Sequence, residues 1–107
     1  MDIKQYDIYW VTLDPTVGSE MRKTRPCVII SPDEMNNYIG TVIIAPLTST
    51  IRLYPSRINY KLDGRSCTIA LDQIKTIDKS RLQSKISHLG LITIKQIKQA
   101  MEDIFCK

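Results

Sequence analysis

Short apolar runs, each stopped by proline, glycine or a cluster of polar turn residues, constrain the fold of this chain most strongly. Runs of this length suit β-strands and are too short for most helices. Strands are predicted at residues 7–13, 27–30, 41–45, 57–62 and 66–71. Residues 74–86 mix polar and apolar side chains and predict one further short strand. Consecutive short strands joined by turns indicate antiparallel pairing.

Turn residues set the expected limits of these strands. Pro15 ends the first strand, and Pro26 is expected at the start or on an edge of the second, because proline has no N–H to donate. Pro46 is expected to end the third strand. The pair Asp63-Gly64 predicts a tight hairpin turn. The polar residues 16–24 and 31–40, and the strand-end segment 47–50, are interpreted as loops.

The C-terminal segment has the period of a helix. One helical face is formed by Ile94, Ile97, Met101, Ile104 and Phe105. Thr93 and Gln96 fit a capping box, although a start one turn earlier is also compatible with the pattern. Antiparallel strands followed by one packed helix indicate a mainly β (α+β) fold, either a small β-barrel or a strongly bent sheet.

Size and charge limit the possible organisation and partners. The 107 residues suffice for one domain, residues 1–107, with one hydrophobic core. Apolar residues make up 43% and charged residues 24%, which is a globular composition and not a disordered one. The formal charge of +4 is compatible with a polyanionic partner, although many basic domains bind none.

Cysteine spacing and hydropathy indicate a cytoplasmic protein. Cys27, Cys67 and Cys106 are odd in number, and no pair has the spacing of a metal or redox motif. The first two lie in apolar runs and are predicted to be buried thiols. The chain has no apolar signal segment and no stretch long enough to cross a membrane. A reducing, cytoplasmic location is therefore expected.

Metal and nucleophile chemistry find little support in the sequence. His88 is the only histidine, and no carboxylate–histidine cluster has the spacing of metal ligands. A serine or cysteine triad would also need a base, and no pattern connects His88 to a nucleophile. His88 is interpreted as structural, and neither a metal ion nor another cofactor is expected.

Cations gather in the loop after the first strand. Arg22, Lys23 and Arg25 stand within four positions, next to the hydroxyl of Ser19. Such a loop is suited to hold phosphates through charge and hydroxyl donors. The alternative is a solvated charged turn.

A second group of cations follows from strand alternation. Arg57 and Lys61 lie on the polar face of the strand predicted at residues 57–62. They offer further phosphate contacts, or they simply form the solvated side of a half-buried strand.

Three ordered segments carry a family resemblance. They are DIYWV, LDP, VGSE and TRP within residues 7–26, TVIIAPLTS at residues 41–49, and ALDQIKTIDKSRL at residues 70–82. Together they resemble the MazF/PemK toxins of type II toxin–antitoxin systems. Tyr6 departs from the family pattern, which usually has glycine there, and residues 51–56 form a short linker beside some relatives.

The resemblance implies a fold and an activity. The implied fold is a small SH3-like β-barrel of the CcdB/Kid type, with a C-terminal helix, that forms a homodimer. The implied activity is sequence-specific, metal-independent cleavage of single-stranded mRNA, leaving 2′,3′-cyclic phosphate and 5′-hydroxyl ends. A cognate MazE-like antitoxin is expected to place an acidic, flexible segment in the RNA groove.

The resemblance also assigns site residues. The family's catalytic arginine and threonine fall on Arg25 and Thr48. Glu20 is a conceivable base, or it orients Arg25, because a free guanidinium gives up protons reluctantly. RNA supplies its own 2′-hydroxyl nucleophile, so the protein must mainly position it and stabilise charge. The predicted RNA-binding residues are Ser19, Arg22, Lys23, Ser49, Arg57, Lys61, Asp72 and Gln73.

Two other classes of protein remain as alternatives. A CcdB-like gyrase poison would share the general architecture but would be a binding protein without nuclease activity. A non-catalytic RNA-binding barrel is the other alternative. RNA cleavage that survives EDTA would separate the nuclease from both.

Overall fold

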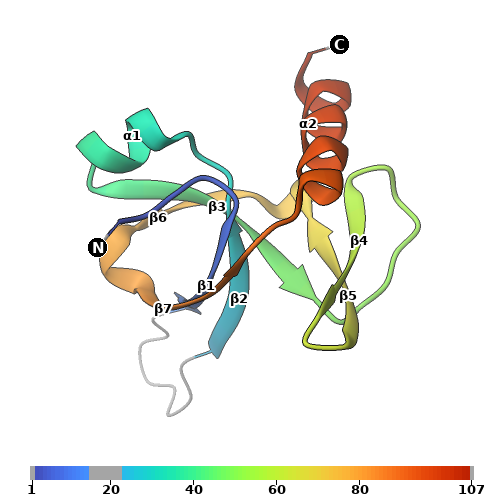
Figure 1. Ribbon diagram of the computed structural model, residues 1–107, viewed down its shortest axis with the longest axis horizontal. Coiled ribbons are helices and arrows are strands. Elements are labelled where there is room, and N and C mark those ends of the chain that lie inside the picture. The colour runs from blue at the N-terminus through green and yellow to red at the C-terminus, as the bar shows by residue number, and fades with distance from the viewer. Residues whose placement is uncertain (1, 15–22, 107) are drawn as a thin grey trace.

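The computed structural model describes residues 2–14 and 23–106 (Figure 1). Within these ranges the strands are β1 (Asp7–Asp14), β2 (Lys23–Ile29), β3 (Thr41–Thr48), β4 (Arg57–Leu62), β5 (Arg65–Ala70), β6 (Lys75–Asp78) and β7 (Leu82–His88). The helices are α1 (Asp33–Tyr38) and α2 (Leu91–Phe105), and short 3-10 turns lie at Leu71–Gln73 and Lys79–Arg81.

All the strand pairs are antiparallel, and β3 is shared between two parts of the sheet. The order is β4-β5-β3-β2-β1-β7, with β6 paired to the first half of β3. Residues 41–44 of β3 pair with β6 and residues 44–46 pair with β2, whereas Leu47 and Thr48 at its end pair with β5. Figure 1 shows β3 crossing between the two parts, with α2 above the β4–β5 side. The predicted bent antiparallel sheet with a C-terminal helix is confirmed.

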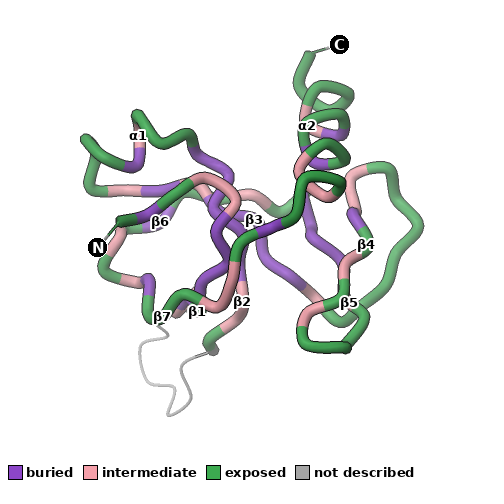
Figure 2. The backbone as a smooth tube through the Cα atoms, in the orientation of Figure 1, coloured by how far each residue is buried: buried purple, intermediate pink, exposed green. Residues whose placement is uncertain are grey.

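Two hydrophobic clusters stabilise this arrangement. Successive residues of β1 belong to different clusters, because their side chains point to opposite faces of the strand. Ile8 is in one cluster with Val28 and Ile97, and Tyr9 is in the other with Cys27. A fully buried isoleucine side chain contributes about 1.5–3 kcal/mol through removal of its surface from water. Figure 2 shows the buried residues concentrated in the central strands. Residues 27–30 are all buried because both faces of β2 are covered, which explains why this segment is apolar without alternation.

Two prolines lie inside strands and not at the limits that the sequence predicted. Pro26 lies within β2, opposite Trp10 of β1, and pairing of β2 with β3 begins only at Cys27. Pro46 lies within β3, in the last pair with β2 before β3 continues beside β5. A missing N–H is tolerated where a strand gains or changes its partner. Pro26 does not start its strand, but it lies where one side of β2 has no paired strand, which agrees with the predicted edge position. The prediction that Pro46 ends a strand was wrong.

Other expected boundaries also differ. Residues 31–40 were predicted as a loop, but Asp33–Tyr38 forms α1 after Pro32, a residue compatible with a helix start. Residues 74–86 contain two strands, β6 and β7, instead of one. Helix α2 begins at Leu91 after Gly90, without a side-chain capping bond, so the predicted capping box is not formed.

The predicted hairpin turn is confirmed and has a defined geometry. Asp63 and Gly64 have φ values of 51° and 79°, which are the left-handed conformations of a type I′ turn. This turn matches the twist of the flanking strands β4 and β5. Neither helix in the described part of the chain is long and apolar enough to cross a membrane.

Candidate active site

A cleft of about 620 Å³ opens where β3 leaves β2. Its lining comes from β1, β2, the end of β3 and the β4–β5 hairpin: Trp10, Arg25, Pro26, Leu47, Thr48, Ser49, Thr50, Leu62, Asp63, Arg65, Ser66 and Cys67. The pairing of β2 with β3 ends at Cys27–Pro46, and Arg25 and Thr48, each two residues beyond this last pair, both line the cleft. The structure thus brings the two predicted catalytic residues to one cleft.

The hydroxyl of Thr48 is held by the backbone of the next segment. The Thr50 N–H donates a hydrogen bond of 3.2 Å to Thr48 Oγ1. The buried side chain of Thr68, which pairs with Thr48 across β3 and β5, donates a 3.2 Å bond to the Thr50 carbonyl. Because Thr48 Oγ1 accepts the Thr50 N–H, its own O–H is available as a donor toward a bound ligand.

The thiol beside Arg25 is not a nucleophile. Cys27 is fully buried, as predicted, and its Sγ lies 3.6 Å from the carbonyl oxygen of Arg25, to which it donates. Burial raises the pKa of Cys27 to about 12, opposed in part by the positive charges of Arg25 and Lys75. A thiol with such a pKa stays protonated near neutral pH. The charged and polar groups that the cleft offers are the guanidinium groups of Arg25 and Arg65, the carboxylate of Asp63 and several hydroxyl groups.

Comparisons with known proteins show the family of the chain. Residues 4–105 match the family described as PemK-like, MazF-like toxin of type II toxin–antitoxin system. The chain belongs to this family. It is 34% identical over 108 residues to Endoribonuclease EndoA of Bacillus subtilis, with 95% of this chain and 93% of that protein covered. It is 37% identical over 107 residues to Endoribonuclease MazF of Staphylococcus saprophyticus, with 94% and 88% covered.

Solved structures of MazF toxins have the same fold. A MazE–MazF structure from Deinococcus radiodurans has a TM-score of 0.84 at 19% identity, covering 99% of this chain and 97% of that one. At this identity the likeness concerns the fold alone. The half-barrel of mostly antiparallel strands with a C-terminal helix is therefore the MazF fold.

The MazF-type cleft contains residues that the sequence analysis did not assign to the site. Trp10, Thr50, Asp63 and Arg65 all line it. No local pattern indicates Trp10, because residues 8–11 are apolar or aromatic throughout and no alternation can be seen there. Cys67 also lines the cleft, and it is only partly buried, contrary to the prediction. Burial raises the pKa of its thiol.

Two of the predicted RNA-binding residues lie in or beside the cleft. Ser49 is part of the lining. Lys61 lines a neighbouring hollow of about 380 Å³ that shares Ser66 and Cys67 with the cleft. The two hollows follow the β4–β5 hairpin, so a chain molecule bound at Arg25 can continue toward Lys61.

Arg57 and Asp72, also predicted to bind RNA, contact each other. Arg57 donates from Nε to Asp72 Oδ1 at 2.6 Å and from its second terminal nitrogen to Oδ2 at 3.1 Å. Ser56 donates a further 3.1 Å bond to this carboxylate. The Arg57 hydrogen bond lowers the pKa of Asp72. The roles of both residues, and of the adjacent Gln73, in RNA binding stay predictions.

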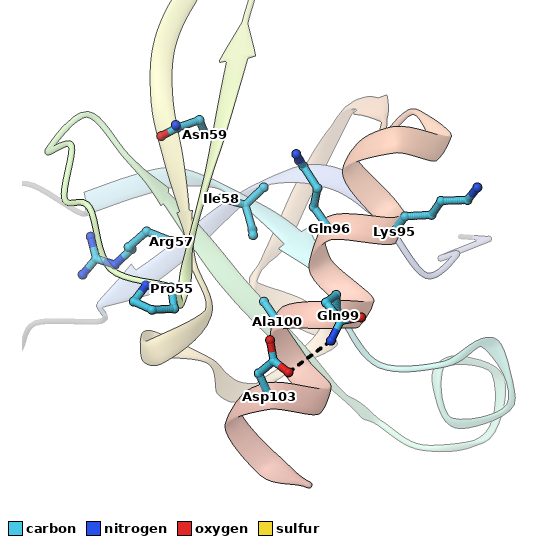
Figure 3. Close-up of a pocket in the computed structure, with 9 residues that line it drawn as sticks. All are labelled: Pro55, Arg57, Ile58, Asn59, Lys95, Gln96, Gln99, Ala100 and Asp103. Atoms are coloured by element: carbon cyan, nitrogen blue, oxygen red, sulfur yellow. Dashed lines mark hydrogen bonds between the residues drawn. The ribbon is translucent and has the colours of Figure 1, made fainter. Parts of the chain in front are cut away.

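Arg57 borders a different hollow from the cleft at Arg25. This groove of about 490 Å³ lies between β4 and α2 (Figure 3). Figure 3 shows Ile58 facing the helix near Ala100, while the guanidinium of Arg57 points away from α2. Arg57 also lies over the ring of Tyr54, with Cζ 5.7 Å from the ring centre. Its surroundings are those of a packed side chain.

The remaining predicted residues lie in or next to the segment between β1 and β2. Ser19, Glu20 and Arg22 lie outside the described residues. Lys23 is the first residue of β2 and pairs through its backbone with Asp14.

His88 contacts a buried carboxylate on another edge of the sheet. Its Nδ1 lies 2.8 Å from Asp7 Oδ1, and the Lys85 Nζ lies 3.3 Å from the same oxygen. These contacts join β1 to β7, and His88 does not line the cleft. Among the described residues, no group of three or more His, Cys, Asp or Glu side chains is placed to hold a metal ion.

Proposed function

We propose that this chain cleaves single-stranded RNA in the cleft at Arg25 and Thr48, without a metal ion. The activity class is that of an endoribonuclease, because the chain belongs to the MazF-like toxins and both curated relatives carry that name. The observation that supports the proposed site is that Arg25 of β2 and Thr48 of β3, each just beyond the last β2–β3 pair, line one cleft.

The chemistry needs few protein groups. The 2′-hydroxyl oxygen of RNA attacks the adjacent phosphorus, and the bond from phosphorus to the 5′-oxygen breaks. The products are a 2′,3′-cyclic phosphate and a 5′-hydroxyl. Arg25 stabilises the negative charge of the pentacoordinate phosphate through its planar donor fork. The Thr48 O–H donates a hydrogen bond to the same group, while Thr48 Oγ1 accepts the bond from the Thr50 N–H.

Two protons also move in this reaction. The 2′-hydroxyl gives up one proton and the leaving 5′-oxygen takes one. The sequence offers Glu20 as the base, because a guanidinium has a pKa above about 12 and is a poor acceptor. A Glu20→Gln variant with the wild-type pH–rate profile would remove Glu20 from this role.

The partners follow from the same site. Arg65 in the cleft and Lys61 beside it supply phosphate contacts, together with Arg22 and Lys23. The protein acts in the cytoplasm as a homodimer whose groove takes the RNA. A cognate antitoxin of the MazE type neutralises it with an acidic, flexible segment. The Deinococcus radiodurans MazE–MazF structure supports this pairing by analogy of fold.

The deciding experiment measures cleavage of a single-stranded RNA in excess EDTA. We expect the wild-type protein to cut the RNA and to leave 2′,3′-cyclic phosphate ends, which mass spectrometry distinguishes from linear phosphates. Lys98 is an exposed cation on α2, and the control variant Lys98→Ala should cleave the RNA normally. Binding without cleavage would support a non-catalytic RNA-binding barrel, and cleavage lost in EDTA would contradict the metal-free mechanism.

A further inference from the structure

We propose that Trp10 is a base-stacking platform that holds the nucleotide next to the scissile phosphate. This inference rests on the proposed function, and it names a residue that positions the substrate for that reaction. Trp10 belongs to β1 and pairs with Pro26, the neighbour of Arg25 in β2. It lines the same cleft as Arg25 and Thr48.

Trp10 is much more exposed than the preceding residue on the same face of β1. Ile8, two residues earlier, is fully buried, whereas Trp10 is 41% exposed. A large aromatic side chain left in contact with water at the mouth of a cleft marks a binding surface better than a scattered apolar residue does. Within the cleft lining that the structure describes, Trp10 is the only aromatic residue.

The surroundings of the indole fit an unpaired base. Pro26, Leu47 and Leu62 supply apolar surface in the cleft. Hydroxyl groups from residues 48–50 and from Ser66 supply donors and acceptors for base edges. A stacked base would thus contact the indole with its flat face and the hydroxyl groups with its edge. Stacking of a base on an aromatic side chain is a common means of holding single strands, and it is unavailable to a base inside a duplex.

Other exposed apolar side chains do not compete for this role. Tyr38 is 87% exposed on α1 and Phe105 is 58% exposed on α2, and neither lines the cleft. Tyr38 is therefore a matched control: it is an exposed aromatic residue away from Arg25.

The first test uses fluorescence, because Trp10 is the only tryptophan in the chain. We would titrate the wild-type protein with a mixed-sequence, fully 2′-O-methylated single-stranded RNA, which lacks the nucleophile. We expect its binding to quench and shift the emission, and the duplex of the same sequence to have much less effect. RNA that binds by anisotropy without changing the emission would overturn the proposal. Emission that responds only to protein concentration would assign Trp10 to a contact between copies and would also overturn it.

The second test uses variants. Trp10→Ala should raise KM by on the order of tenfold with a smaller change in kcat, and Trp10→Phe should recover most of the loss. Tyr38→Ala should cleave like the wild type. A Trp10→Ala variant with wild-type KM would overturn the stacking role and leave the proposed nuclease intact. A wild-type protein that cuts no RNA would instead remove the proposed function.

A third test joins protein and substrate. Once the cleavage site is mapped, an abasic nucleotide placed on either side of it removes one base at a time. For the wild-type protein, one of the two abasic substrates should raise KM about as much as the Trp10→Ala substitution does. With the Trp10→Ala variant, the same substrate should raise KM little further, because the contact is already absent. Fully additive losses at both positions would contradict a direct contact.

Discussion

Two arginines on neighbouring parts of the sheet illustrate how surroundings decide what a charged side chain does. Arg57 of β4 is fixed by a two-point contact with Asp72, and its side chain is only 7% exposed. Arg25 of β2 is half-buried in a cleft whose lining is rich in hydroxyl groups. The first arginine is part of the packing between β4 and the turn at Leu71–Gln73. The second is placed to meet a ligand.

The largest expected effect comes from Arg25. Arg25→Ala should reduce kcat/KM for RNA cleavage by on the order of 100-fold or more, because one donor to the developing charge is lost. Arg25→Lys should recover only part of this, since a lysine lacks the planar fork. Single-turnover cleavage measures both, and circular dichroism checks the fold. Arg57→Ala as the matched arginine should retain most of the activity; equal losses in both would remove the contrast between the two sites.

Thr48 should give the next largest effect. Thr48→Val removes the hydroxyl while keeping the side-chain shape, and we expect a loss on the order of 10- to 100-fold in kcat. Thr48→Ser keeps the hydroxyl and should be tolerated in part. Thr41→Val at the other end of β3, opposite Asp78, is the control. Normal cleavage by Thr48→Val would show that the hydroxyl takes no part in the reaction.

Salt dependence separates cations that contact RNA from cations that do not. Lys61→Ala and Arg65→Ala should each reduce the slope of log affinity against log salt by about 0.7. Arg57→Ala should leave the slope unchanged, because Asp72 already neutralises its charge. Titrations at several ionic strengths give the slopes. A shallower slope in Arg57→Ala would support the RNA contact that the sequence predicts for this residue.

The Arg57–Asp72 contact should matter for stability instead. Asp72→Asn should lower the free energy of unfolding by about 1 kcal/mol, because the partly exposed ion pair is weakened and the Arg57 charge stays little exposed. Denaturant unfolding measures this change. Unchanged stability would mean that the contact is replaced by water at no cost.

Acid should remove the contribution of the Arg57–Asp72 contact to the free energy of unfolding of the wild-type protein. The Arg57 hydrogen bond lowers the pKa of Asp72 in the folded protein. The stability is thus fully present above the unfolded-state pKa of about 3.9, and it is lost as pH falls through the lower folded pKa. Below about pH 4 the wild-type protein should lose more stability than Asp72→Asn does. If the free energy of unfolding fell equally with pH in the two proteins, this linkage would be contradicted.

Much of the secondary structure could be predicted because it depends on neighbours in sequence. Strict alternation identified β4, and Asp63-Gly64 identified the turn after it. Helical spacing identified α2 to within a turn. Periodicity and turn chemistry act over a few residues, so they can be read from a single chain. The predicted catalytic residues were assigned through family resemblance, since no local pattern connects Arg25 to Thr48.

What only the tertiary structure decided depends on which segments meet. Pro26 and Pro46 both lie inside strands. Pro26 precedes the first residue of β2 that pairs with β3, and directly after Pro46 the partner of β3 changes from β2 to β5. Arg57 and Lys61 look equivalent on one strand face, yet only Arg57 meets a carboxylate fifteen residues away. The sequence by itself determined the presence of β1 to β5, the turn at Asp63-Gly64, helix α2 and the family resemblance. Long-range pairing, which has no local signature, decided which cations face the cleft.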